Sequence, residues 1–199
     1  MNFKALAATA AALFSLGGAQ AAVTTINFDD LAAPCLFSGQ APLTNQYAAL
    51  GVTFQAVNGP EMEVLNQCGG FGFNAHSGTD FLAYNTAVTG SQFDAIITAT
   101  LGSASIWAAS NQGGTATLQA FDALNNLVDS DSLALSSSWQ QLSISGNDIA
   151  YLRLVSTASQ FGAFDDLQFD PAAIPEPATL ALVGMALLGI RASRRRSAT

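Results

Sequence analysis

The residues best suited to chemistry in this chain are two pairs of aspartates in the same short context. Phe-Asp-Asp-Leu occurs around Asp29 and Asp30 and again around Asp165 and Asp166. Because the ends of a domain tend to lie close together, we expect the two segments to be neighbours. Four crowded carboxylates need a cation or raised pKa values. Ca²⁺ prefers several oxygen ligands, so we predict a calcium site here, with chance repetition in an aspartate-rich chain as the alternative.

Residues suited to catalysis are few. A nucleophilic serine or cysteine needs a base beside it, yet His76 is the only histidine and residues 22–173 contain no lysine. Glu61 and Glu63 point the same way on an extended chain and could form the carboxylate pair of a glycoside hydrolase. Glutamates next to a turn are more often ordinary surface residues. We therefore predict a protein that is not an enzyme, with a glycoside hydrolase as the less favoured alternative.

Aromatic side chains in a glycine-rich segment indicate a binding role. Phe71 and Phe73 lie among glycines in the segment 66–78. A loop of this composition does not easily bury both rings, and exposed aromatic rings can stack on sugars. We predict carbohydrate contact at Phe71 and Phe73, as in a lectin-like binding module, with packing in the protein core as the alternative.

The scaffold that must position these residues is predicted to be all-β. Segments rich in Thr, Val, Ile and Phe alternate between apolar and polar residues, with turn residues between them. About nine or ten short strands with regular turns favour a β-sandwich of jelly-roll type. The predicted strands are 23–28, 51–57, 80–88, 92–98, 103–109, 115–121, 127–135, 139–145, 149–156 and 163–169.

The N-terminus, residues 1–21, has the pattern of a secretory signal peptide. Lys4 supplies the positive charge, residues 5–16 form an apolar core, and Ala19-Gln20-Ala21 is a small-residue cleavage site. We predict cleavage after Ala21 and export of the remaining chain. A retained N-terminal anchor is the weaker alternative, because the apolar core is short.

The cysteine content fits an exported protein. Cys35 and Cys68 are the only cysteines. In an oxidising compartment we expect them to form a disulfide, for which the chain-entropy model gives about 3.8 kcal/mol of stabilisation. The alternative is a pair of metal ligands, but the spacing and neighbouring ligands of a zinc site are missing.

The predicted body, residues 22–173, is strongly acidic. Thirteen aspartates and glutamates stand against one basic residue, Arg153, which gives a net charge of −12. Such a body is repelled by nucleic acid and by anionic lipid headgroups. Neutral sugars, cations and basic proteins remain possible partners, and solubility alone is the alternative explanation.

The C-terminal segment, residues 174–199, has three parts in a fixed order. Pro175-Glu176-Pro177 is followed by an uncharged apolar run at 178–190, and then by arginines at 191, 194, 195 and 196. The run is about 13 residues, against the roughly 20 that span a bilayer. Snorkelling arginines and local thinning of the bilayer can cover part of the difference, so we predict a transmembrane helix, with an apolar helix packed on the body as the less favoured alternative.

This order of parts resembles the PEP-CTERM sorting signal of Gram-negative bacteria. The resemblance implies that an exosortase, a membrane-embedded cysteine protease-transpeptidase, cuts at or near Pro175, Glu176 and Pro177. Arg194, Arg195 and Arg196 would be the stop signal. The implied protein is held briefly in the inner membrane and then delivered to the cell surface or extracellular matrix. We expect an adhesive or structural role there, in association with exopolysaccharide.

Overall fold

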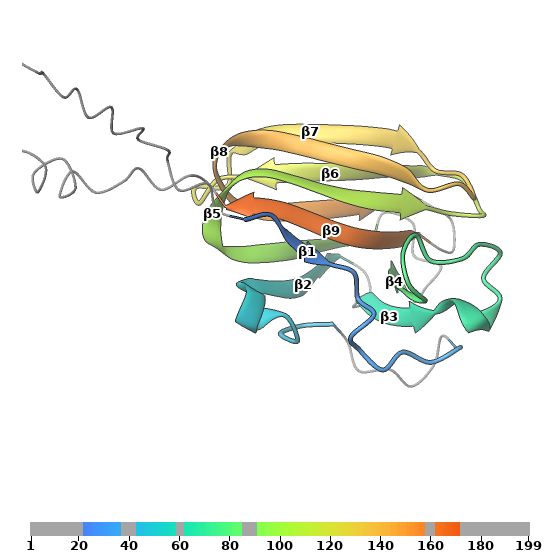
Figure 1. Cartoon of the computed structure of the whole chain (residues 1–199). Helices are drawn as coiled ribbons and strands as arrows, with labels where there is room; N and C mark the ends of the chain where they lie inside the picture. Colours follow the sequence, from blue (N-terminus) through green and yellow to red (C-terminus); the bar gives the residue numbers. More distant parts are fainter. Residues whose placement is uncertain (1–21, 37–42, 59–61, 85–90, 158–161, 172–199) are drawn as a thin grey trace, which may run out of the picture. The chain divides into compact units, whose positions relative to one another are not determined.

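A computed structural model describes residues 22–36, 43–58, 62–84, 91–157 and 162–171 (Figure 1). All regular elements in these ranges are β-strands or short 3-10 turns, which confirms the all-β prediction. They are β1 (Thr24–Ile26), η1 (Ala48–Leu50), β2 (Val52–Asn58), β3 (Met62–Asn66), η2 (Gln67–Gly69), β4 (Asp80–Tyr84), β5 (Ser91–Ala109), β6 (Thr115–Phe121), β7 (Leu127–Ala134), β8 (Gln140–Ser156) and β9 (Ala163–Pro171).

The predicted signal peptide and the predicted C-terminal membrane helix lie outside the described residues. Within the described ranges, no helix has the length and apolar character needed to cross a membrane.

The nine strands form two layers joined by β5 and β8. Every pairing is antiparallel, and β5 pairs with β8 along two stretches that are separated by shifts of register. The stretch 103–108 pairs with 140–145, while 91–96 pairs with 151–156. The first layer runs β3-β4-β9-β5-β8, with β1 also paired to β9, and the second runs β2-β5-β8-β6-β7. This strand order does not by itself assign a jelly-roll connectivity, which remains a prediction.

One apolar core fills the space between the layers. Ile106, Leu142 and Phe164 come from the first layer and pack in one cluster with Leu118 and Leu152 from the second. All five side chains are fully buried, and each contributes about 1.5–3 kcal/mol of transfer free energy. Buried and half-buried residues alternate along β6, as the period of a strand requires.

Two predicted turns are bends inside long strands. Sequence patterns split β5 at residues 99–102 and β8 at 146–148, whereas each is continuous in the structure. At Gly146 the backbone passes so close to the Val128 side chain that a Cβ atom would overlap it. Gly146 therefore serves close packing and not a chain reversal. Strand β3 was missed, because it is short and follows Gly59-Pro60.

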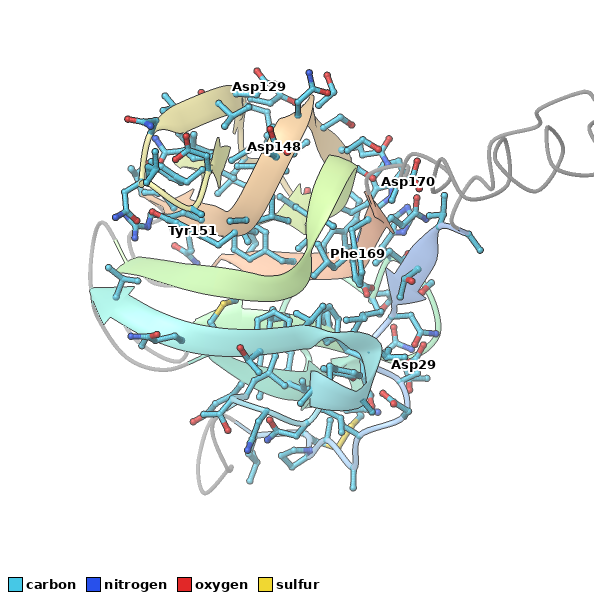
Figure 2. All side chains as sticks on the ribbon, turned by 90° about the vertical axis from the view of Figure 1, so that its left-hand side faces the viewer. Asp29, Asp129, Asp148, Tyr151, Phe169 and Asp170 are labelled. Atoms are coloured by element: carbon cyan, nitrogen blue, oxygen red, sulfur yellow. A yellow bond between two sulfur atoms is a disulfide. The ribbon has the colours of Figure 1, made fainter. Side chains whose placement is uncertain are left out.

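Both open sides of the sandwich are bridged. The carboxylates of Asp129 and Asp131 on β7 accept hydrogen bonds from the backbone N–H groups of Ser145 (2.8 Å) and Ser143 (2.9 Å) on β8. On the other side, the backbone at Leu43 and Thr44 links β3 to β2. These bridges satisfy groups that an edge strand would otherwise offer to another chain. Asp129 lies at the top of the body in Figure 2, and Asp29 lies lower down at its right-hand edge.

The first and last described strands are neighbours, as predicted. β1 pairs with β9 through Thr24↔Phe169 and Ile26↔Leu167. The two Phe-Asp-Asp-Leu sequences therefore end up at the same layer of the sandwich.

Candidate functional site

A long segment between β3 and β4 packs on the outer face of the first layer. We call residues 67–79 the covering loop. The rings of Phe71 and Phe73 lie 5.7 and 5.6 Å from that of Phe81, and Phe73 lies 5.6 Å from Trp139. With Leu65 and three alanines, these four aromatic residues form a second hydrophobic cluster.

Phe71 and Phe73 are therefore half-buried and hold the covering loop on the sheet. The outer face of β4 offers Phe81 as an apolar partner, so both rings are partly covered and neither is fully buried. Carbohydrate contact by either ring stays a prediction.

The disulfide between Cys35 and Cys68 is present, which confirms the predicted pairing. The Cα atoms are 5.1 Å apart across a sequence separation of 33. The Asn66 side chain accepts a hydrogen bond from the backbone N–H of Cys68 at 2.9 Å, and the backbone N–H of Asn66 donates to the carbonyl of Pro34 at 3.0 Å. The start of the covering loop is thus fixed both covalently and by hydrogen bonds.

Asp165 binds the middle of the covering loop through its backbone. The residue is fully buried. One carboxylate oxygen accepts the N–H groups of His76 at 2.8 Å and Ser77 at 3.2 Å, and the other accepts the N–H of Asp166 at 2.7 Å. A single buried side chain therefore satisfies three backbone donors.

Asp166 binds the same two loop residues through their side chains. Its carboxylate lies 2.6 Å from Nδ1 of His76 and accepts the hydroxyl of Ser77 at 2.7 Å. The imidazole ring stacks on Trp107 with a centroid distance of 3.9 Å and an angle of 18°. Serine, histidine and aspartate meet here, but the hydroxyl donates to the carboxylate. In a catalytic triad it would donate to the imidazole.

Asp29 holds the end of the covering loop. Its carboxylate accepts the N–H groups of Thr79 at 2.7 Å and Asp80 at 3.0 Å. Gly78 has φ +55°, and a Cβ atom there would overlap the Asp29 carboxylate. Burial raises the pKa of Asp80, although its hydrogen bonds from Thr79 and Asn66 act in the opposite direction.

Asp30 points elsewhere, to Tyr47. The tyrosine hydroxyl donates to the Asp30 carboxylate at 2.6 Å. Burial of the ring, together with this hydrogen bond, raises the pKa of Tyr47. Tyr47 also packs edge-on against Phe28, at 5.8 Å between ring centroids, so this pair fixes the chain where β1 ends.

The four predicted calcium ligands therefore have protein partners. Asp29, Asp165 and Asp166 converge on the covering loop, and Asp30 binds Tyr47. In the described part of the chain, no three histidine, cysteine or carboxylate side chains are grouped as a metal site requires. Sequence spacing predicted the convergence. N–H and O–H donors of the protein satisfy these carboxylates, and calcium binding at these residues stays a prediction.

The stability of the body should depend on the protonation of Asp165. Burial raises the pKa of this carboxyl to about 7, assisted by the charge of Asp166, against the lowering effect of the three N–H donors. The unfolded carboxyl titrates near 3.9. The stabilising contribution of the bound proton is therefore full below about pH 4, and it is lost as the pH rises through about 7.

As the pH is lowered from 7.5 to 5, protonation of Asp165 should raise the melting temperature of the wild type. The variant Asp165→Asn should lack this rise. Thermal unfolding of both proteins across this range measures the difference. Asp148→Asn is the control, since Asp148 is exposed and asparagine tolerates its φ of 61°. Parallel curves of melting temperature against pH for the wild type and Asp165→Asn would show that protonation of Asp165 does not stabilise the body.

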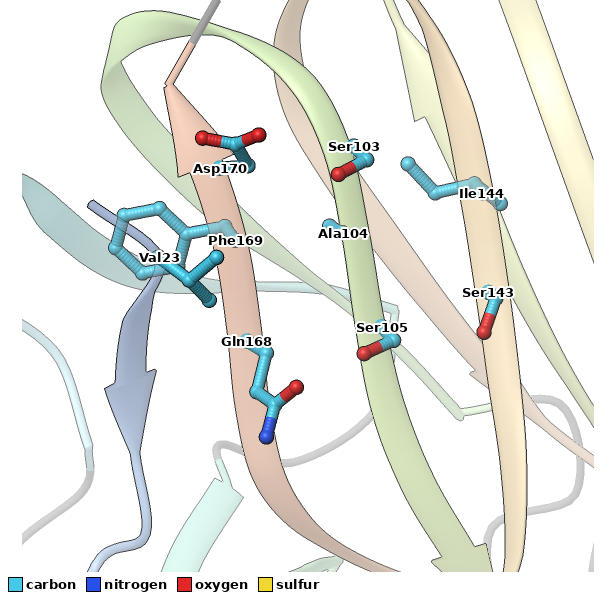
Figure 3. Close-up of a pocket in the computed structure, with 9 residues that line it drawn as sticks. All are labelled: Val23, Ser103, Ala104, Ser105, Ser143, Ile144, Gln168, Phe169 and Asp170. Atoms are coloured by element: carbon cyan, nitrogen blue, oxygen red, sulfur yellow. The ribbon is translucent and has the colours of Figure 1, made fainter. Parts of the chain in front are cut away.

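Next to the covering loop, a groove crosses β9, β5 and β8 on the same outer face (Figure 3). Its volume is about 260 Å³. The polar lining side chains are Ser103, Ser105, Ser143, Gln168 and Asp170.

Trp107 follows Ser105 by two residues and therefore shares its face of β5. The groove thus begins beside the covering loop and ends at Asp170, near the end of β9 (Figure 2). Sequence reasoning missed this site, because small polar residues at every second position of a strand look like any solvated face. The order of residues along the chain also does not show that β5, β8 and β9 bring these small polar residues side by side.

Comparison with known families finds the sorting signal. Residues 173–196 match the family model of the PEP-CTERM protein-sorting motif. The chain carries this motif, and the resemblance drawn from Pro175-Glu176-Pro177, the apolar run and the arginines is confirmed. The matched residues lie outside the part of the chain that the structure describes. No curated protein sequence matches the chain.

Comparison with solved structures supports the fold. The K2 cleaved adhesin domain of Lys-gingipain superposes with a TM-score of 0.50 at 13% identity, over 74% of this chain and 97% of that one. The CBM22-1 xylan-binding domain of Paenibacillus barcinonensis Xyn10C gives a TM-score of 0.47 at 12% identity, over 78% and 98%. TmCBM61, solved with β-1,4-galactotriose, gives 0.44 at 16%, over 67% and 99%. At 13% identity, the likeness to the adhesin domain concerns the fold alone.

Proposed function

We propose that this chain is an exported, non-catalytic protein of the cell surface or extracellular matrix, whose β-sandwich body associates with exopolysaccharide. The observation that carries the proposal is the PEP-CTERM motif at residues 173–196. The motif indicates export through a membrane-anchored sorting step. A signal peptide at 1–21 and a membrane helix within 174–199 complete the route, with an exosortase as the processing enzyme.

The body fits an extracytoplasmic destination. The Cys35–Cys68 disulfide needs an oxidising compartment to persist. With a net charge of −12 over residues 22–173, the body stays soluble and does not adhere to anionic lipid headgroups.

A structural or adhesive role agrees with how the polar residues are used. Asp29, Asp165, Asp166 and His76, whose side chains are of types used in catalysis, are engaged in holding the covering loop. For a glycoside hydrolase, Glu61 lies outside the described residues, and Glu63 is half-buried on β3. The second candidate is a lectin-like module, favoured by the polar groove on β9, β5 and β8.

Replacing Pro175, Glu176 and Pro177 by alanines should block processing in the native host. The protein should then accumulate uncut as a heavier band in the membrane fraction, because the exosortase no longer recognises its site. Ser197→Ala with Thr199→Ala is the matched control, since both residues lie beyond the matched motif. Cell fractionation and immunoblotting read the result. If the triple variant is processed like the control, the sorting proposal is wrong.

A further inference from the structure

We propose that the groove across β9, β5 and β8 binds a neutral, hydroxyl-rich saccharide chain and rejects acidic polysaccharides. Gln168 and Asp170 would be the main polar contacts. The inference rests on the proposed association with exopolysaccharide, and it adds the place of binding and the chemical class of the polymer.

The groove presents polar groups that are not committed elsewhere. Among the described residues, no hydrogen bond engages the side chains of Ser103, Ser143, Gln168 or Asp170. Ser105 accepts one from Gln141 at 3.2 Å. A serine hydroxyl and a glutamine amide each donate and accept, whereas a carboxylate only accepts. A ligand with many hydroxyl groups can satisfy this mixture, because each hydroxyl is also both donor and acceptor.

Asp170 places in the groove a carboxylate that lacks a hydrogen-bond donor. One of its carboxylate oxygens, Oδ1, is shielded from water and has no hydrogen-bond partner within the described ranges. A shielded acceptor without a donor costs free energy. Because Oδ1 has lost its hydration, a ligand hydroxyl that donates a hydrogen bond to Oδ2 stabilises this carboxylate more than it would stabilise a fully hydrated one. Asp170 and Ser103 lie opposite each other on neighbouring strands, so one sugar residue can reach both (Figure 3).

The charge around the groove selects the class of polymer. Its lining contains no basic side chain, while Asp170 contributes a negative charge. Asp131 adds a second negative charge beside the groove, because the Asp131 carboxylate accepts a hydrogen bond from the backbone N–H of Ser143. A uronate, sulfate or phosphate group placed here would face two carboxylates in a body of net charge −12. A neutral polymer avoids this repulsion.

The groove is also rigid and has apolar contacts at both ends. Its polar residues stand on β5, β8 and β9, whose ladders fix the spacing of the side chains. Val23 is 61% exposed at one end and can cover the C–H face of a sugar ring. Trp107, braced by His76, adjoins the other end.

The test uses the full chain purified in mild detergent, with neutral glucan, galactan and xylan and with acidic alginate and hyaluronan as probes. We expect a neutral polymer to bind, and Gln168→Ala and Asp170→Asn each to weaken its Kd by about ten-fold, the loss of about one hydrogen bond. Ser143→Tyr should block the groove. Gln119→Ala, on the outer face of the second layer, is the matched control and should bind normally.

Thermal unfolding of each variant shows that it is folded. Neutral-polymer binding that survives all three groove variants would overturn the groove assignment while leaving the proposed association intact. Stronger binding to alginate or hyaluronan than to the neutral polymers would overturn the assigned class. Binding of no polysaccharide at all would overturn both the groove and the association, and the processing of the Pro-Glu-Pro variant would still test the sorting route separately.

Discussion

Asp165→Ala should lower the free energy of unfolding by about 3 kcal/mol. The substitution removes the acceptor of three backbone N–H groups, those of His76, Ser77 and Asp166. Each buried donor left without a partner costs about 1–3 kcal/mol, and water entering the space recovers part of the sum. Urea unfolding measures the loss. Faster hydrogen exchange at the amides of His76 and Ser77 should accompany it.

Asp165→Asn should cost less, about 1 kcal/mol, because its amide oxygen still accepts from the loop. Asp148→Asn, at an exposed position, should leave stability unchanged. An alanine variant as stable as the wild type, with unchanged amide exchange at the loop, would show that Asp165 does not hold the covering loop.

Removing the disulfide should have an effect of similar size. In the chain-entropy model, the Cys35–Cys68 link contributes about 3.8 kcal/mol by restricting the unfolded chain. The double variant Cys35→Ser, Cys68→Ser should therefore melt about 8–15 °C lower than the oxidised wild type. Calorimetry under identical buffer conditions gives the shift.

Reduction of the wild type supplies the matching experiment. Reductant should lower its melting temperature to that of the double variant, and it should leave the variant unchanged. If the oxidised wild type and the double variant melt together, the link contributes nothing and the aspartate contacts alone fix the covering loop.

Local sequence pattern predicted the strands best where each strand pairs regularly. β6 has the bounds that alternation gave, Thr115–Phe121, because its inward residues are all apolar. Leu152 and Leu154, which are apolar residues two positions apart in the predicted strand 149–156, lie in the core. Prediction failed where β5 and β8 continue through an expected break. In β8 the reason is that Gly146, which allows close packing, looks the same in sequence as a glycine in a turn.

The candidate site was only partly predictable. The repeated Phe-Asp-Asp-Leu showed that two aspartate pairs would share a layer. The partners of Asp165 and Asp166 lie 88–90 positions away in the covering loop, and no local pattern reports such contacts. The groove depends on the register of three strands. That register is set by pairing across the whole sandwich, so residues as ordinary as Ser103 and Gln168 gave no signal.

The position of β9 between paired strands determines how the body would respond to a pulling force. The chain leaves the described body at Pro171, so tension on whatever follows would pull along β9. This strand is bonded to β5 on one side and to β4 and β1 on the other. A pull along its length loads many hydrogen bonds in shear at once, where peeling would break them one at a time. An attachment at this strand would therefore suit a protein that must resist flow while it is tethered.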